Sequence, residues 1–102
     1  MEQVQQNAIG VQIVEQITED GAIVNISAAT VKQMVFKKPN NTTITKDANL
    51  YTNGTDGKLI YTTEAGFLDV TGIWEEQPIV TFSGGGYSGN GSKTYFEVLP
   101  NI

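Results

Sequence analysis

The sequence contains no cysteine and no histidine. These absences exclude disulfides and thiol nucleophiles, and they remove the side chains from which most zinc sites are built. Without histidine a Ser-His-Asp triad is impossible, and the usual general base near neutral pH is missing. Any catalysis would depend on carboxylates, on Lys93 or on a tyrosine, so we predict that the protein is not an enzyme.

Basic residues are few. The chain has 6 lysines and arginines against 11 acidic residues, which gives a net charge of −5. The basic residues are scattered apart from the pair Lys37-Lys38. Binding to nucleic acid or to an anionic membrane needs a concentrated basic face. We therefore expect neither nucleic acid nor a membrane as a partner.

Long apolar runs are also missing. No run approaches the roughly 20 residues of a membrane-spanning helix. The start, MEQVQQNAIG, has neither the basic nor the apolar region of a signal peptide. Residues 1–7 are polar, and we predict that they form a flexible N-terminal arm. Residues 8–102 have the length and the apolar content of a single domain.

The chain does contain apolar residues that alternate with polar ones. Alternation at period two indicates half-buried β-strands, and no long segment has a convincing helical period. Turn signals such as Asn53-Gly54 and Asp56-Gly57 separate the alternating segments. The pattern predicts an all-β fold, an antiparallel β-sandwich of about seven strands. The expected strands cover approximately residues 8–18, 22–26, 31–38, 42–51, 58–63, 72–82 and 93–99.

A glycine-rich stretch, SGGGYSGNGSKT, occupies residues 83–94. Gly84, Gly86 and Gly89 have the spacing of a dinucleotide-binding turn, and the stretch is one residue out of register with a P-loop. Both phosphate-binding motifs must open a helix, whereas strands are expected on both sides here. We therefore interpret the stretch as a hairpin loop and expect no cofactor. Tyr87 near its tip is either an anchor for a partner or an exposed residue without one.

The acidic residues raise two further kinds of site, and the sequence favours neither. The densest acidic group could hold the carboxylate pair of a glycosidase, but such a pair needs a cleft for which a small sandwich has little room. The turn at residues 53–57 lacks the closing bidentate acid of a calcium loop. We expect no catalytic residues and no metal site. The acidic group consists of Glu64, Asp69, Glu75 and Glu76.

Four stretches, taken in order, resemble a known family. The chain is similar, over about residues 12–102, to the immunoglobulin-like domain found at the N-terminus of phage baseplate upper proteins and in related phage virion proteins. Those proteins carry a KPDGT turn, a GTDGK–Y–AGDLD–AG–W block and a closing FEV–PN. The matching stretches are VFKKPNNTTITK (35–46), NGTDGKLIYTTEAG (53–66), LDVTGIW (68–74) and FEVLPNI (96–102).

The resemblance implies an immunoglobulin-like sandwich that serves as a non-enzymatic structural component of a phage virion. Its expected partners are other phage virion proteins, with homo-oligomers in the assembled particle, and its expected location is the virion. A baseplate or tail adaptor competes here with a capsid decoration protein. The alternative is a carbohydrate-binding module for host-surface glycans, because sugars stack on aromatic faces. The aromatic residues that motivate it are Tyr51, Tyr61, Trp74, Tyr87 and Tyr95.

Core and contact residues can be assigned from the pattern and the resemblance together. Trp74 takes the place of the buried aromatic at the corner before strand F, so its indole N–H should find a carbonyl partner. The expected core residues are Phe36, Ile44, Leu50, Trp74, Val80, Phe96 and Val98. The expected partner contacts are Gln3, Gln5, Glu76, Gly85, Gly86 and Tyr87.

The strand after Trp74 departs from the family pattern. Glu76 and Pro78 stand at positions that are apolar in the similar proteins. A lone inward carboxylate is unfavourable, and proline is normally confined to an edge strand or a bulge. Either the strand bulges near Gln77 and turns Glu76 outward, or the strand is an edge that meets a neighbouring subunit.

Overall fold

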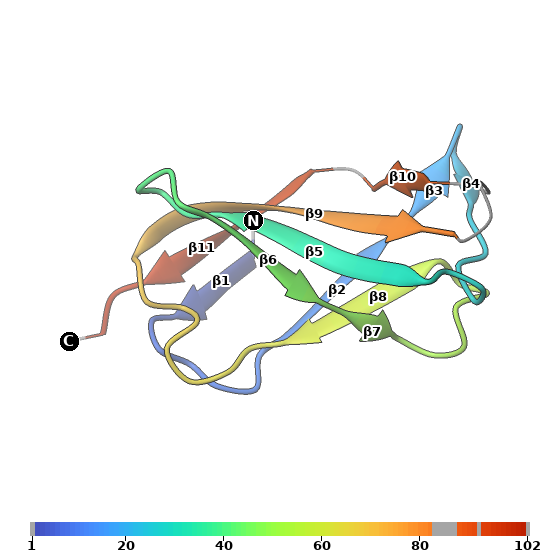
Figure 1. The fold of residues 1–102 in the computed structure, drawn as a ribbon. Helices are drawn as coiled ribbons and strands as arrows, with labels where there is room; N and C mark the ends of the chain where they lie inside the picture. The colour runs from blue at the N-terminus through green and yellow to red at the C-terminus, as the bar shows by residue number, and fades with distance from the viewer. Residues whose placement is uncertain (1, 83–87, 92, 102) are drawn as a thin grey trace.

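The computed structural model of the chain describes residues 2–82, 88–91 and 93–101. These residues form strands and turns, and none of them lies in a helix, so this part of the chain has no helix that could cross a membrane. Two sheets face each other across a shared core, which gives an all-β, sandwich-like arrangement (Figure 1). Most strand pairs are antiparallel.

The larger sheet has six strands. Its order is β1-β11-β9-β5-β6, and β10 also pairs with β9. The long strand β9 is central, because β5 lies along one side of it and β11 and then β10 lie along the other. Only β1 is parallel to its partner, β11. The strands are β1 (Glu2–Gln5), β5 (Val31–Lys37), β6 (Thr43–Asp47), β9 (Gly72–Thr81), β10 (Ser88–Asn90) and β11 (Thr94–Leu99).

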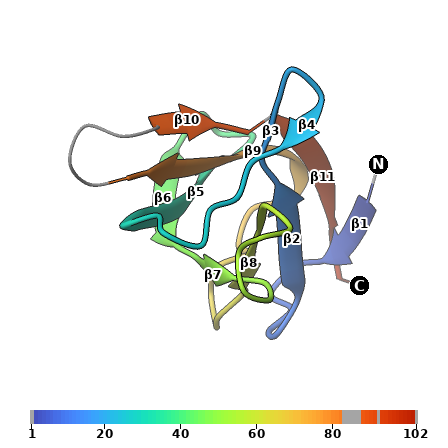
Figure 2. The same ribbon diagram turned by 90° about the vertical axis from the view of Figure 1, so that its right-hand side faces the viewer.

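The smaller sheet has the order β2-β8-β7. It comprises β2 (Gln12–Gln16), β7 (Asn49–Leu50) and β8 (Lys58–Thr62). Figure 2 shows these three strands as a layer beneath β5 and β9. A short hairpin, β3 (Thr18–Glu19) with β4 (Ala22–Ile23), extends the end of β2.

The described residues form eleven strands, more than the seven or so that the sequence predicts, because two predicted segments are broken and β1 and β10 lie outside the predicted segments. Residues 42–51 form two strands in different sheets, because the chain leaves β6 and enters β7 at Ala48. Ala48 is buried, and its N–H donates to the carbonyl of Lys32 in β5. The segment 8–18 is likewise broken at the buried Ile17, whose N–H donates to Gly57 O. Strands that change sheets close the corner of a sandwich, and alternation alone does not reveal the crossing point.

The N-terminal segment differs from the prediction. The sequence predicts a flexible arm over residues 1–7, whereas Glu2–Gln5 form β1 at the edge of the larger sheet. The N–H groups of Gln6 and Asn7 continue the contact by donating to Leu99 O and Leu68 O. Val4 is the one apolar residue of β1, so the segment is held mainly by backbone hydrogen bonds, which leave no hydrophobic pattern in the sequence.

One hydrophobic cluster fills the space between the sheets. Of the expected core residues, Phe36, Trp74, Val80, Phe96 and Val98 are buried, and Ile44 and Leu50 are partly buried and pack against them. Phe67, from the connection between β8 and β9, sits among the rings. Its centroid lies 4.9 Å from that of Phe36, 5.0 Å from Tyr61 and 5.5 Å from Trp74.

Both predicted explanations of Glu76 and Pro78 are corrected by the structure. The register of β9 with β5 runs without a bulge from Glu75 opposite Lys37 to Thr81 opposite Val31, and β9 is not an edge. Pro78 is tolerated because its carbonyl accepts from Gly91 N–H at 2.9 Å, at the break between β10 and β11. In an antiparallel ladder a residue's N–H and C=O point to the same side, so the missing N–H faces this break.

Gly91 fits against Pro78 only because it lacks a side chain. A Cβ at this position would lie 2.5 Å from Pro78 Cγ. We expect Gly91→Ala to lower the free energy of unfolding by about 1–3 kcal/mol, because the proline ring and the backbone at residue 91 must move apart. Urea denaturation of Gly91→Ala, Pro78→Ala and the double variant would measure this. In the Pro78→Ala background, Gly91→Ala should lower the free energy of unfolding by less than it does in the unaltered protein. Equal losses in both backgrounds would mean that the proline ring is not what excludes a side chain at residue 91.

Candidate interaction surface

The side of the larger sheet that faces away from the smaller one is here called the outer face. Along β9 the inward residues Trp74, Glu76, Pro78 and Val80 are buried, and their neighbours point the other way. Residues directly opposite in an antiparallel pair share a side of the sheet. The outer face therefore contains Val31, Gln33, Val35, Lys37, Ile73, Glu75, Gln77, Ile79, Tyr95 and Glu97.

A charged group lies at the middle of the outer face. Glu75 forms ion pairs with two lysines. Lys93 Nζ is 3.3 Å from Oε1, and Lys37 Nζ is 4.0 Å from Oε2. A hollow of about 150 Å³ opens here, lined also by Val35 and Gln77. Two lysines against one carboxylate leave an excess of one positive charge at this point of an otherwise acidic chain. The hollow is suited to a carboxylate or a polar side chain of a partner.

Apolar side chains flank this charged centre. Ile73 and Tyr95 are each 49% exposed and are diagonal neighbours on β9 and β11. Val31 is 37% exposed at the opposite end of the face. Exposed aromatic and aliphatic residues are typical of protein contact surfaces, in which charged residues lie mainly at the rim.

Of the predicted contact residues, two are exposed in the structure, one is buried, and three lie outside the described residues. Gln3 and Gln5 are exposed on β1, at the edge of the larger sheet, and Gln3 Nε2 donates to Glu97 Oε1 at 3.0 Å. Gly85, Gly86 and Tyr87 lie outside the described residues. Glu76 is only 4% exposed and points into the sandwich, so it is not available as a surface contact in this structure.

Glu76 shows why one of the contact predictions is corrected. Thr94 Oγ1 donates to Glu76 Oε1 at 2.9 Å, whereas Oε2 is buried with no hydrogen-bond partner among the described residues. Burial, and next the hydrogen-bonding and charge of Glu15, raise the pKa of Glu76. The alternating pattern of β2 already had Glu15 on its apolar side, but the sequence does not indicate that the two interruptions meet.

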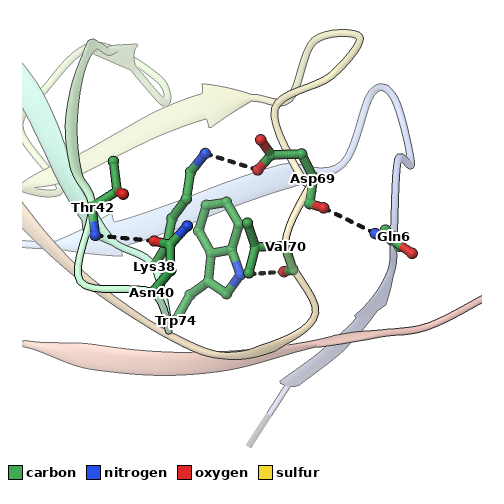
Figure 3. A network of polar contacts seen from close by, with 7 residues as sticks. All are labelled: Gln6, Lys38, Asn40, Thr42, Asp69, Val70 and Trp74. Atoms are coloured by element: carbon green, nitrogen blue, oxygen red, sulfur yellow. Dashed lines mark hydrogen bonds and ion pairs between the residues drawn. The ribbon is translucent and has the colours of Figure 1, made fainter.

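Trp74 has a structural role in the polar network of Figure 3. Its indole is completely buried, and Nε1 donates to Val70 O at 2.8 Å, as expected for the corner motif. The buried Lys38 places Nζ 5.4 Å from the centroid of the indole and 2.8 Å from Asp69 Oδ1. A tryptophan enclosed in this way cannot serve as a stacking platform for a sugar.

The same network joins three connections of the fold. Lys38 begins the turn between β5 and β6, and Asp69 belongs to the connection between β8 and β9. Gln6 follows β1, and its Nε2 donates to Asp69 O at 2.9 Å. Asn40 orders the turn after Lys38 by accepting from Thr42 N–H at 3.0 Å (Figure 3). The acidic residue of the LDVTGIW stretch is thus part of the scaffold.

The other aromatics do not form a shared platform among the described residues. Tyr61 is buried in the core, Tyr51 is 46% exposed in the connection between β7 and β8, and Tyr95 belongs to the outer face. Tyr51 and Tyr95 are thus carried by different sheets. Tyr87 lies outside the described residues. A glycan would therefore meet Tyr51 or Tyr95 singly.

The turn considered for calcium uses its oxygens internally. Asn53 Oδ1 accepts from Thr55 N–H and from Thr55 Oγ1, and Asp56 accepts from Lys58 N–H and Thr52 Oγ1. The hydrogen bonds to Asp56, first that from Lys58 N–H and then that from Thr52, lower the pKa of its carboxyl group. Within the described parts of the chain no group of three potential ligands of the His, Cys, Asp or Glu type is assembled for a metal ion.

The glycine-rich stretch, interpreted from the sequence as a hairpin loop, contains the strand β10, which pairs with β9, and leads into β11. Residues 88–90 form β10, and β11 begins at Thr94, three residues after Gly91. Of residues 88–91 and 93–99, which the structure describes, none lies in the helix that both phosphate-binding motifs require. Comparison with known proteins adds no assignment, since no family model and no curated protein matches the chain.

Proposed function

We propose that the chain is an immunoglobulin-like, non-enzymatic structural module of a phage virion that acts through protein–protein contacts in a multi-copy assembly. The strand order β1-β11-β9-β5-β6 opposite β2-β8-β7 supports the fold part of this proposal. We assign β2 to B, β5 to C, β6 to C′, β7 to D, β8 to E, β9 to F and β11 to G, so that the division between the sheets resembles that of a variable-type immunoglobulin domain, with no strand assigned to C″.

The outer face is the observation that carries the functional part. It presents the exposed Ile73 and Tyr95 beside the Lys37–Glu75–Lys93 group on the surface formed by β5, β9 and β11. We assign this face to a neighbouring virion protein that offers an apolar side chain and a carboxylate. Gln3 and Gln5 on β1 border the same sheet and remain predicted contacts.

Localisation tests the role directly. Immunogold labelling of purified particles of the encoding phage should place the protein on the tail or baseplate. Label on the head would instead support the alternative of a capsid decoration protein. Absence of the protein from purified particles would contradict both. Binding on a glycan array at millimolar concentration would favour the carbohydrate-binding alternative, against which the burial of Trp74 argues.

Incorporation into particles should depend on the outer face. We expect the double variant Ile73→Ser, Tyr95→Ser to be recovered in purified particles at least tenfold less than the unaltered protein, since apolar contact residues that become buried in an interface contribute about 1–4 kcal/mol each. Quantitative mass spectrometry of particles would measure this. Ile9→Ser is the control, because Ile9 is 68% exposed and lies in the connection after β1, off the outer face. Equal recovery of all variants would remove the outer face from the proposal.

A further inference from the structure

Two acidic residues interrupt the inward sides of two strands in opposite sheets. Glu15 of β2 stands between Ile13 and the buried Ile17 that follows the strand, and Glu76 lies among buried residues of β9. Strands β2 and β9 are in contact across the sandwich. The Glu15 carboxyl group lies near enough to raise the pKa of Glu76 through hydrogen bonding and charge, after the larger effect of burial.

The hydrogen bonds of this pair are complete only if a proton is present. Thr94 supplies one donor to Glu76 Oε1, and no donor of the described residues reaches the buried Oε2. An ionised Glu15 can only accept, so two carboxylates would leave Oε2 without a partner and bring two negative charges together. A proton on either carboxyl group supplies the missing donor and removes one of the charges.

The surroundings offer no opposite charge among the described residues. Glu2 of β1 adds a further negative charge near Glu76. Across the ladders, Phe36 of β5 lies opposite Glu76 and Leu59 of β8 lies opposite Glu15, and both are apolar. From β11 the contact is the neutral Thr94 hydroxyl.

The nearby lysines are directed to the other side of the sheet. Lys37 and Lys93 both pair with Glu75, which points to the outer face. This carboxyl pair is buried, lacks a hydrogen-bond donor for one oxygen and has no cation beside it among the described residues. Such a pair retains one proton at pH values well above those at which glutamate usually loses it.

We propose that Glu15 and Glu76 share one proton at neutral pH and act as a pH-sensitive catch that holds β2 against β9. Loss of this proton at alkaline pH leaves two facing carboxylates and releases β2 from the inner side of the larger sheet. This device concerns the closure of the sandwich and stands independently of the proposed virion role.

The direction of the pH effect follows from proton binding. Between the ordinary pKa of glutamate and the raised pKa of Glu76, the folded chain holds one proton more than the unfolded chain. The folding equilibrium constant therefore falls as pH rises through this window, by up to about tenfold per pH unit, and the stabilisation is fully present below the unfolded pKa. Because the chain has no histidine, no ordinary side chain titrates between about pH 5.5 and 8.5 to obscure the effect.

Carbon-13 NMR of the glutamate carboxyl groups in the unaltered protein is the first test. We expect the pair to titrate in two steps, one of them above pH 7, and Glu76→Gln should remove that upper step. Titration of every glutamate below pH 6 would overturn the proposal. The titration of the unaltered protein is decisive by itself and does not require any variant to fold.

Unfolding by urea at pH 5.5, 7 and 8.5 is the second test. The midpoint of the unaltered protein should fall with pH, and that of Glu76→Gln should stay nearly level, because the amide can donate to Glu15 without a titratable proton. Glu15→Gln should keep a smaller slope, because burial, the largest cause of the raised pKa of Glu76, remains in this variant. The matched control is Glu75→Gln, which changes the adjacent residue on the outer face. In this variant the urea midpoint should still fall with pH. An equal slope in Glu76→Gln and the unaltered protein would contradict the catch.

Calcium chloride distinguishes a proton from a metal ion. Millimolar calcium at pH 7 should leave the thermal midpoint of the unaltered protein unchanged to within about a degree. A calcium-dependent rise that is lost in Glu76→Gln would mean that the two carboxylates hold a cation, and the proton-sharing proposal would be wrong. Amide exchange corrected for intrinsic pH dependence should accelerate selectively in β2 at pH 9, and unchanged protection there would argue against release of this strand.

Discussion

Replacing Trp74 by alanine will lower the free energy of unfolding by about 3–5 kcal/mol, the range found when a large aromatic side chain is removed from a core. The indole is completely buried and contacts the rings of Phe67 and Phe96 at centroid distances of 5.5 and 5.6 Å. Its loss also removes the hydrogen bond to Val70 O and the ring beneath Lys38. Urea denaturation followed by circular dichroism would measure the change.

The comparison of Trp74→Phe with Trp74→Ala separates packing from the polar network. Phenylalanine keeps much of the ring contact and loses the Nε1 donor, so it should cost distinctly less than alanine. If Trp74 instead served as an exposed platform, both substitutions would leave stability nearly unchanged. A loss below about 1 kcal/mol for alanine would contradict the burial on which the structural role of Trp74 depends.

The paired strands of the two sheets were the part of the fold most accessible from sequence. In β5 the buried Met34 and Phe36 alternate with outward residues, so period two gave both the strand and its buried side, whereas the buried side of β9 includes Glu76 and Pro78 and was not expected. The turn residues gave the connection at residues 38–42, where Asn41 has a φ of 69° and Lys38 and Thr42 close the backbone hydrogen bond. In these segments the local sequence and the tertiary contacts favour the same structure.

The rest depends on contacts between residues distant in the sequence. β1 is specified by backbone pairing with β11, and backbone groups carry no residue-level signal. The position of Pro78 is acceptable only because Gly91 lies beside it at a break in the neighbouring strand. Each of these features contradicts a local rule and is resolved by a partner that local pattern cannot identify.

The candidate site followed the same division. Trp74 and its carbonyl partner could be expected from the corner motif, because the motif is local and Val70 lies four residues away. The outer face could not, since it forms only when β5, β9 and β11 are placed side by side. The sequence shows Glu15 and Glu76 as exceptions to the alternation of their strands. That the two side chains lie near each other follows only from the packing of one sheet against the other.

Substituting alanine for Gly54 will have the second large effect. The turn at residues 53–57 packs onto the chain after β4, where Ile26 N–H donates to Gly54 O at 2.9 Å. A Cβ on Gly54 would lie 2.7 Å from both the N and the Cα of Ser27. These are backbone atoms, which cannot move aside as the end of a flexible side chain can, and Gly54 also has a φ of +91°.

We expect Gly54→Ala to lower the free energy of unfolding by about 3 kcal/mol or more, because the cost of the backbone clash adds to about 1–2 kcal/mol for a side chain at positive φ. The matched control is Gly66→Ala, where φ is +79° and nothing lies within 4 Å of the added Cβ, so only the conformational cost applies. Urea denaturation of the two variants isolates the contact term. Equal losses would mean that the turn at residues 53–57 does not need the close approach to Ser27, and that its glycine serves the turn conformation alone.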